Sequence, residues 1–133
     1  MTPREHATLA VETATAALDD ARKWLREEVK AEIAALSIVS VDAGFSSMTT
    51  AVEFVLGPSE TIDDDDGPFV MWCLSSKTWI ALALRHDGFR VEACCPSENR
   101  RGEWRLSDMT LDAAVKAALL WLADRDVFVE VRR

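Results

Sequence analysis

The sequence predicts an α+β domain in which a long N-terminal helix and a C-terminal helix cover one face of an antiparallel β-meander of about five to six strands. Three features of the chain support this prediction. It opens with apolar residues spaced three or four apart, continues with short apolar or alternating segments between turn residues, and returns to helical spacing near its end. The length of 133 residues suits one domain, so we expect residues 1–133 to fold as a unit.

The N-terminal helix is expected to begin at a capping box. Thr2 is a candidate N-cap, Pro3 fits the first helical position, and Glu5 follows at the third. An apolar stripe then continues as far as Leu36, without a glycine or a second proline. A helix of this length would extend about 50 Å, at about 1.5 Å per residue, which is more than a domain of this size needs. We expect it either to break near residues 16–17 or to project at one end as an interaction surface.

The central part of the chain is expected to form the sheet. The expected strands span residues 38–41, 48–56, 69–74, 78–84, 89–93 and 103–106. Asp87-Gly88 predicts a tight hairpin turn, because Asp-Gly accepts the positive φ angles that such turns require.

A second helix should follow, capped by Asp108 or Thr110, with its buried stripe running from Leu111 to Leu122. The largely apolar residues 127–131 predict a short final strand that pairs with the sheet or with another chain.

Composition indicates a cytoplasmic protein. No segment approaches the roughly 20 apolar residues of a membrane span, and the start of the chain lacks the basic and then apolar order of a signal peptide. The three cysteines, Cys73, Cys94 and Cys95, are an odd number with two adjacent, which does not suit a disulfide framework. We therefore expect reduced thiols and no membrane association.

The negative charge is concentrated in one part of the chain. Residues 31–76 contain no Lys or Arg. The acidic residues of this stretch are Glu32, Asp42, Glu53, Glu60, Asp63, Asp64, Asp65 and Asp66. These eight acids equal the net charge of −8, so the rest of the chain is balanced. An acidic surface disfavours nucleic-acid binding and favours a basic protein partner, whereas the simpler interpretation is that the charge maintains solubility.

The aspartate run does not match an EF-hand, the commonest acidic calcium loop. If Gly67 takes the sixth position of such a loop, Ile62 takes the first and Cys73 the twelfth, and neither can ligate calcium as required. No zinc-ligand spacing and no Gly-rich phosphate loop occurs, so we expect neither a metal site nor a cofactor. The run is therefore interpreted as an exposed acidic loop.

The sequence offers one weak candidate for catalysis. Cys94 or Cys95 could approach His86 across a hairpin, although one of two adjacent strand residues should point into the core. Glu53 lies between apolar neighbours, but alternation predicts that it faces outward. We expect no catalytic residues.

Five tryptophans are candidates for the core or for binding anchors. Trp72 and Trp79 belong to the central strands and should be buried. Trp24 and Trp104 are the better candidates for partly exposed anchors.

These features favour a non-enzymatic acidic protein-binding module. Its most concrete form is an immunity- or antitoxin-like inhibitor whose acidic loop occupies the basic active site of a nuclease toxin. The expected partner-binding residues are Glu53, Glu60, Asp63, Asp64, Asp65, Asp66 and Trp104. Two alternatives stay open: a dimeric secretion chaperone that binds an export substrate, and a small enzyme that uses a Cys/His pair or an acidic cation site. A monomer and a homodimer are equally compatible with the sequence.

Overall fold

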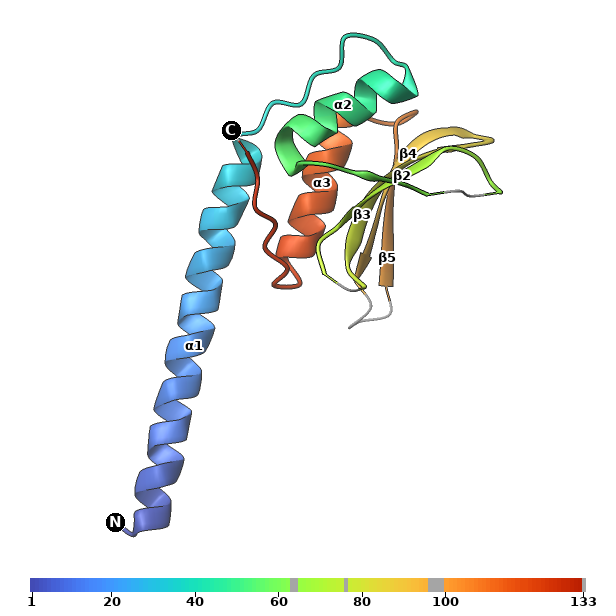
Figure 1. Ribbon diagram of the computed structural model, residues 1–133. Helices are drawn as coiled ribbons and strands as arrows, with labels where there is room; N and C mark the ends of the chain where they lie inside the picture. The colour runs from blue at the N-terminus through green and yellow to red at the C-terminus, as the bar shows by residue number, and fades with distance from the viewer. Residues whose placement is uncertain (63–64, 76, 96–99, 133) are drawn as a thin grey trace.

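The computed structural model describes residues 1–62, 65–75, 77–95 and 100–132, and it confirms the α+β fold. The elements are α1 (Pro3–Ala34), α2 (Phe45–Leu56), β1 (Glu60–Ile62), β2 (Phe69–Cys73), β3 (Trp79–Arg85), β4 (Gly88–Cys95), β5 (Arg100–Arg105) and α3 (Leu111–Ala123). Each strand pairs antiparallel with the next in the chain, so the order β1-β2-β3-β4-β5 is a simple meander. Figure 1 shows α3 against the sheet and α1 extending away from both.

Helix α1 is continuous and projects from the rest of the molecule (Figure 1). Its N-cap is as predicted, because the Thr2 hydroxyl accepts a hydrogen bond of 3.1 Å from the Glu5 amide. No break occurs near residues 16–17, so the alternative of a projecting end is the correct one. Residues 1–25 are exposed, and the helix is buried only at Val29 and Ile33, in the part that packs against α3.

Two ion pairs reinforce the attachment of α1 to the turn after α3. Arg26 contacts Asp126 and Lys30 contacts Asp124, each at 2.6 Å. All four side chains are partly exposed, and ion pairs of this kind contribute about 0–1 kcal/mol each. Apolar burial near the end of α1 is therefore the main anchor of this helix.

The strands predicted at residues 38–41 and 48–56 are wrong. Residues 38–41 join no sheet, and all of residues 48–56 belong to α2. Met48, Val52 and Val55 are buried at steps of four and three, which is the spacing of one helix face. The alternating pattern placed Phe54 in the core, whereas this side chain is 78% exposed. Burial of the helical face outweighs the strand preference of the β-branched and aromatic residues.

The main core lies between the sheet and the helices. Its fully buried side chains include Ile33, Val52, Ile80, Leu82, Val91, Val115, Leu119 and Leu122. Trp72 is also buried in this core, and its indole nitrogen donates a 2.9 Å hydrogen bond to the Gly57 carbonyl at the end of α2. A smaller cluster of Phe69, Ala81 and Ala83 lies on the other face of the sheet, where the half-buried Trp79 packs against it.

The final strand predicted at residues 127–131 is also wrong. These residues form no strand, although Val127, Phe128, Val129 and Val131 pack partly buried against the core. The segment runs back toward the end of α1 (Figure 1), and the Arg132 amide donates to the Val55 carbonyl at 2.9 Å. The apolar residues of this segment therefore indicated burial but did not determine how its backbone pairs.

Candidate functional site

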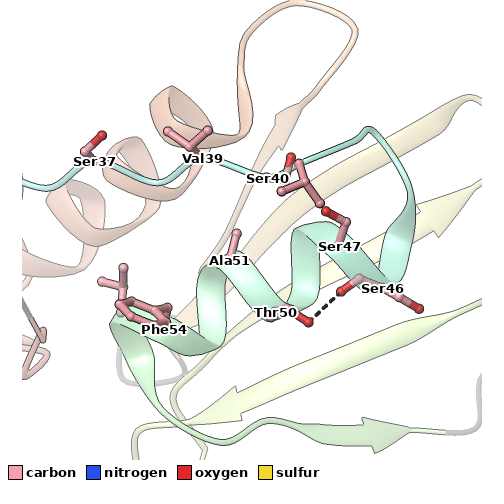
Figure 2. Close-up of a pocket in the computed structure, with 10 residues that line it drawn as sticks. Ser37, Val39, Ser40, Ser46, Ser47, Thr50, Ala51 and Phe54 are labelled. Atoms are coloured by element: carbon pink, nitrogen blue, oxygen red, sulfur yellow. Dashed lines mark hydrogen bonds between the residues drawn. The ribbon is translucent and has the colours of Figure 1, made fainter.

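A cavity of about 460 Å³ lies between the extended segment 37–41 and helix α2 (Figure 2). We call it the α2 groove. Its lining residues are Ser37, Val39, Ser40, Val41, Ser46, Ser47, Thr50, Ala51, Phe54 and Val55. Apolar walls with a few polar groups are typical of binding sites.

The backbone on both sides of the groove forces apolar side chains outward. In the extended segment, Leu36 and Ile38 are buried, so the alternation of side chains leaves Val39 77% exposed and Val41 96% exposed. The buried face of α2 consists of Met48, Val52 and Val55. Phe54 lies outside this face and is therefore exposed to solvent. Figure 2 shows Val39 on the segment that crosses above the helix and Phe54 near the C-terminal end of α2. The groove therefore exposes three large apolar side chains within a short stretch of chain.

The hydroxyl groups of the groove are used locally. Thr50 donates to the Ser46 carbonyl at 2.9 Å, which is the dashed line in Figure 2, and the Ser47 hydroxyl accepts from the Asp42 amide at 3.3 Å. None of the ten lining side chains is ionisable. The groove therefore offers an apolar surface with hydroxyl groups, a composition that suits binding.

Two acidic residues adjoin residues of the groove in the sequence. Asp42 follows Val41 directly and accepts a 2.6 Å hydrogen bond from the Gly44 amide. Glu53 precedes Phe54 and accepts from the Ser59 amide at 3.3 Å. The whole groove is built from the stretch without Lys or Arg, and a cation from elsewhere, Arg132, approaches the end of α2 at Gly57. The groove is thus apolar at its centre and acidic in its immediate sequence surroundings.

The aspartate run does not stand alone in solvent. Asp65 and Asp66 line a shallow cavity together with Arg85, His86 and Arg90 of the neighbouring hairpin. Asp63 and Asp64 lie outside the described residues. Basic side chains of the same molecule therefore lie close to the described half of the run and offset part of its negative charge.

The other predicted binding residues lie on different parts of the molecule. Glu60 is exposed on β1, at one edge of the sheet, whereas Trp104 is in β5 at the opposite edge. Four strand spacings of about 4.8 Å separate these edges by about 19 Å. Trp104 is half-buried and packs edge-to-face on Trp121 of α3 at 6.1 Å. The expected residues therefore do not form one site.

Trp24 is the tryptophan that is most clearly available for contact. It is 69% exposed on the projecting part of α1. The prediction that Trp24 is partly exposed is confirmed, and so is the burial of Trp72, while Trp79 lies half-buried on the open face of the sheet.

The candidate Cys/His couple is not brought together. In the β3–β4 ladder, Gly88 pairs with Arg85 at the turn and Cys94 pairs with Trp79 at the far end. His86 is at the turn, so about six residues at about 3.3 Å each, roughly 20 Å, separate it from Cys94. Cys95 is 2% exposed in the core, as expected for one of the two cysteines.

Within the described ranges, no cluster of His, Cys, Asp and Glu could hold a metal ion.

Strands β4 and β5 and the β3–β4 turn carry a charged network. Arg90 donates to Asp87 at 2.6 Å and to Glu103 at 3.0 Å. The hydrogen bond from Arg90 holds the pKa of Asp87 below its ordinary value, and the same contact raises the pKa of Arg90. Every charge in this network has an opposite charge beside it, which indicates a structural role.

Comparison with protein-family models, with curated proteins and with solved structures found no match to this chain. In the part of the chain that the structure describes, no helix combines the length and the apolar character needed to cross a membrane.

Sequence reasoning missed the α2 groove because it treated both of its walls as strands. One signal was the pair of adjacent apolar residues Ile38 and Val39, because successive side chains of an extended segment point to opposite sides and only one of the two can face the core. A second signal was the i, i+4, i+7 spacing of Met48, Val52 and Val55, which predicts a helix and leaves Phe54 outside its buried face.

Proposed function

We propose that the protein is a non-enzymatic protein-binding module whose α2 groove receives apolar side chains from a basic region of a partner protein. The observation that carries this proposal is the exposure of Val39, Val41 and Phe54 together, in a stretch of chain without Lys or Arg. Exposed apolar side chains grouped in one hollow are typical of interaction sites.

The apolar side chains and the acidic residues are expected to contribute to partner binding in different ways. Complete burial of a Val or Phe side chain is worth about 1.5–3 kcal/mol, so the three exposed side chains supply several kcal/mol when a partner covers them. This gain alone does not offset the entropy lost on association. The acidic residues Asp42 and Glu53 would add orientation and a faster encounter with a basic surface.

The concrete form of this function is an immunity-type inhibitor of a basic nuclease toxin. Such a toxin presents Lys and Arg to the phosphates of its substrate, and an acidic surface with an apolar centre complements that face. In this form, Glu53 replaces the aspartate run as the principal acidic contact, because Asp65 and Asp66 lie beside Arg85 and Arg90.

The test is affinity capture of the partner from the source lysate at low and high salt. The apolar variant combines Phe54→Gln with Val41→Thr, both at exposed positions, and Phe54→Leu is its matched control. We expect a basic partner to be captured by the wild type and by the control, lost from the apolar variant, and weakened by salt and by Glu53→Gln. Retention of the same partner by the apolar variant at every salt concentration would refute the proposal.

A second candidate function is that of a secretion chaperone, and the exposed apolar side chains of α1 and of the α2 groove favour it. Its proposed pairing strand, residues 127–131, does not exist, so an export substrate would have to bind these apolar surfaces. Limited proteolysis of the captured complex separates the two candidates. A partner that is cleaved rapidly throughout its length is held unfolded, as a chaperone substrate would be, whereas a toxin stays folded and resistant.

A further inference from the structure

The projecting part of α1 carries large apolar side chains that nothing in the described chain covers. Leu9, Val11, Leu18, Trp24 and Leu25 are between 43% and 69% exposed. Three of the five, Val11, Leu18 and Leu25, face the same way as Val29 and Ile33, which are buried in the main core farther along the helix. The helix therefore continues an interface-like face well beyond the body of the molecule (Figure 1).

This face has a seven-residue repeat of two kinds of side chain. Large residues recur at Val11, Leu18 and Leu25, and small residues recur at Ala7, Ala14 and Ala21. The two series alternate at steps of three and four, which are the a and d positions of a coiled coil. A strict repeat of seven over this length indicates a helix that pairs with another helix.

We infer that α1 pairs in antiparallel orientation with α1 of a second copy of this chain. In an antiparallel pair, an a position lies opposite a d position of the other helix. Val11 then faces Ala21 of the second copy, Leu18 faces Ala14, and Leu25 faces Ala7. Every layer combines one large and one small side chain, so the two helices pack at a constant separation.

The charges at the two ends of the helix fit the same register. It places Arg4 opposite Glu28 of the second copy, and by the two-fold symmetry this pair occurs at both ends. Both residues are exposed on α1. A parallel pair would instead oppose Arg4 to Arg4 and Glu28 to Glu28, and would place the two bodies of the molecule at the same end.

The length of the exposed helix also agrees with this pairing. The register places Pro3 of one copy opposite Val29 of the other, and Val29 is the first residue of α1 that is buried within its own molecule. Each exposed stripe is therefore covered by the other from end to end. Trp24, beside the stripe, lies opposite Ala10 of the second copy, where a small residue leaves room for the indole ring.

The test measures the mass of the full chain in solution by sedimentation equilibrium over a range of concentrations. We expect a species of twice 14.8 kDa. Leu18→Lys should raise the dimer dissociation constant by roughly tenfold or more, because it places a charge against Ala14 of the second copy. Ala16→Lys, on the opposite face of the helix, should leave the constant unchanged.

A charge exchange tests the orientation. Arg4→Glu alone should weaken the dimer by roughly threefold or more at low salt, and adding Glu28→Arg should restore it, because only the antiparallel register joins these two positions. A monomer at all concentrations, or equal effects of Leu18→Lys and Ala16→Lys, would overturn the dimer. A dimer that the double exchange does not restore would overturn its antiparallel register. Thermal unfolding of each variant checks that the body of the molecule is intact.

Discussion

Replacement of Trp72 by phenylalanine tests the joint between the sheet and helix α2. The indole ring is 3% exposed, and its nitrogen donates to the Gly57 carbonyl at 2.9 Å, where α2 ends. Phenylalanine keeps an aromatic ring in the core but cannot donate this hydrogen bond. Gly57 is itself buried, so no water is expected to replace the lost donor.

Two effects of the substitution add. An unsatisfied buried carbonyl costs about 1–3 kcal/mol, and the smaller ring leaves a void that costs about another 1 kcal/mol. We therefore expect the free energy of unfolding to fall by about 2–4 kcal/mol. For a domain of this size, each kcal/mol lowers Tm by roughly 4 °C, so the melting temperature should fall by roughly 8–16 °C.

Urea unfolding followed by far-UV circular dichroism measures the difference. Phe54→Leu is the control, because Phe54 belongs to the same joint but is 78% exposed, and this variant should change stability by less than about 0.5 kcal/mol. Equal stability of the two variants would refute the argument that the buried indole hydrogen bond fastens α2 to the sheet.

Three further predictions concern turns and caps. Gly67→Ala should destabilise the protein by about 1–3 kcal/mol more than Gly88→Ala in thermal unfolding, because both glycines have positive φ but only at Gly67 would a Cβ lie 2.6 Å from a main-chain carbonyl oxygen. Thr110→Ala should cost about 1 kcal/mol, measured by urea unfolding, since the Thr110 hydroxyl accepts from an amide of the first turn of α3. The lowered pKa of Asp87 implies stability that is present above its ordinary value of 3.8 and is lost as pH falls through the lower folded value. Asp87→Asn should remove that part of the acid dependence, and an NMR titration that found the pKa of Asp87 at or above its ordinary value would contradict the argument.

Strands β2 to β5 could be predicted from the sequence because their signals are local, whereas β1 was not predicted. Asp87-Gly88 identified the β3–β4 turn, and the fully apolar runs before it identified the central strands β2 and β3. The caps of α1 and α3 were also predicted correctly, since Thr2 and Thr110 each accept from an amide three residues later. Each of these signals depends only on residues a few positions apart.

The α2 region could not be predicted in the same way because its periodicity is ambiguous. The segment from Met48 to Leu56 satisfies an alternating pattern and a helical pattern with different subsets of its apolar residues. Contacts distant in sequence decide between them, including the hydrogen bond between Trp72 and Gly57. The candidate site is formed by this region, so its location could not be predicted either.

The contact between Arg132 and Val55 has a consequence for the order in which the chain folds. The meander and α3 involve pairings between neighbours in the sequence, and these contacts can form while the chain is still being synthesised. The hydrogen bond from the Arg132 amide closes a loop of more than half the chain, and it cannot form until that residue has left the ribosome. During translation, the C-terminal end of α2 therefore gains this contact only after the sheet and α3 have been synthesised.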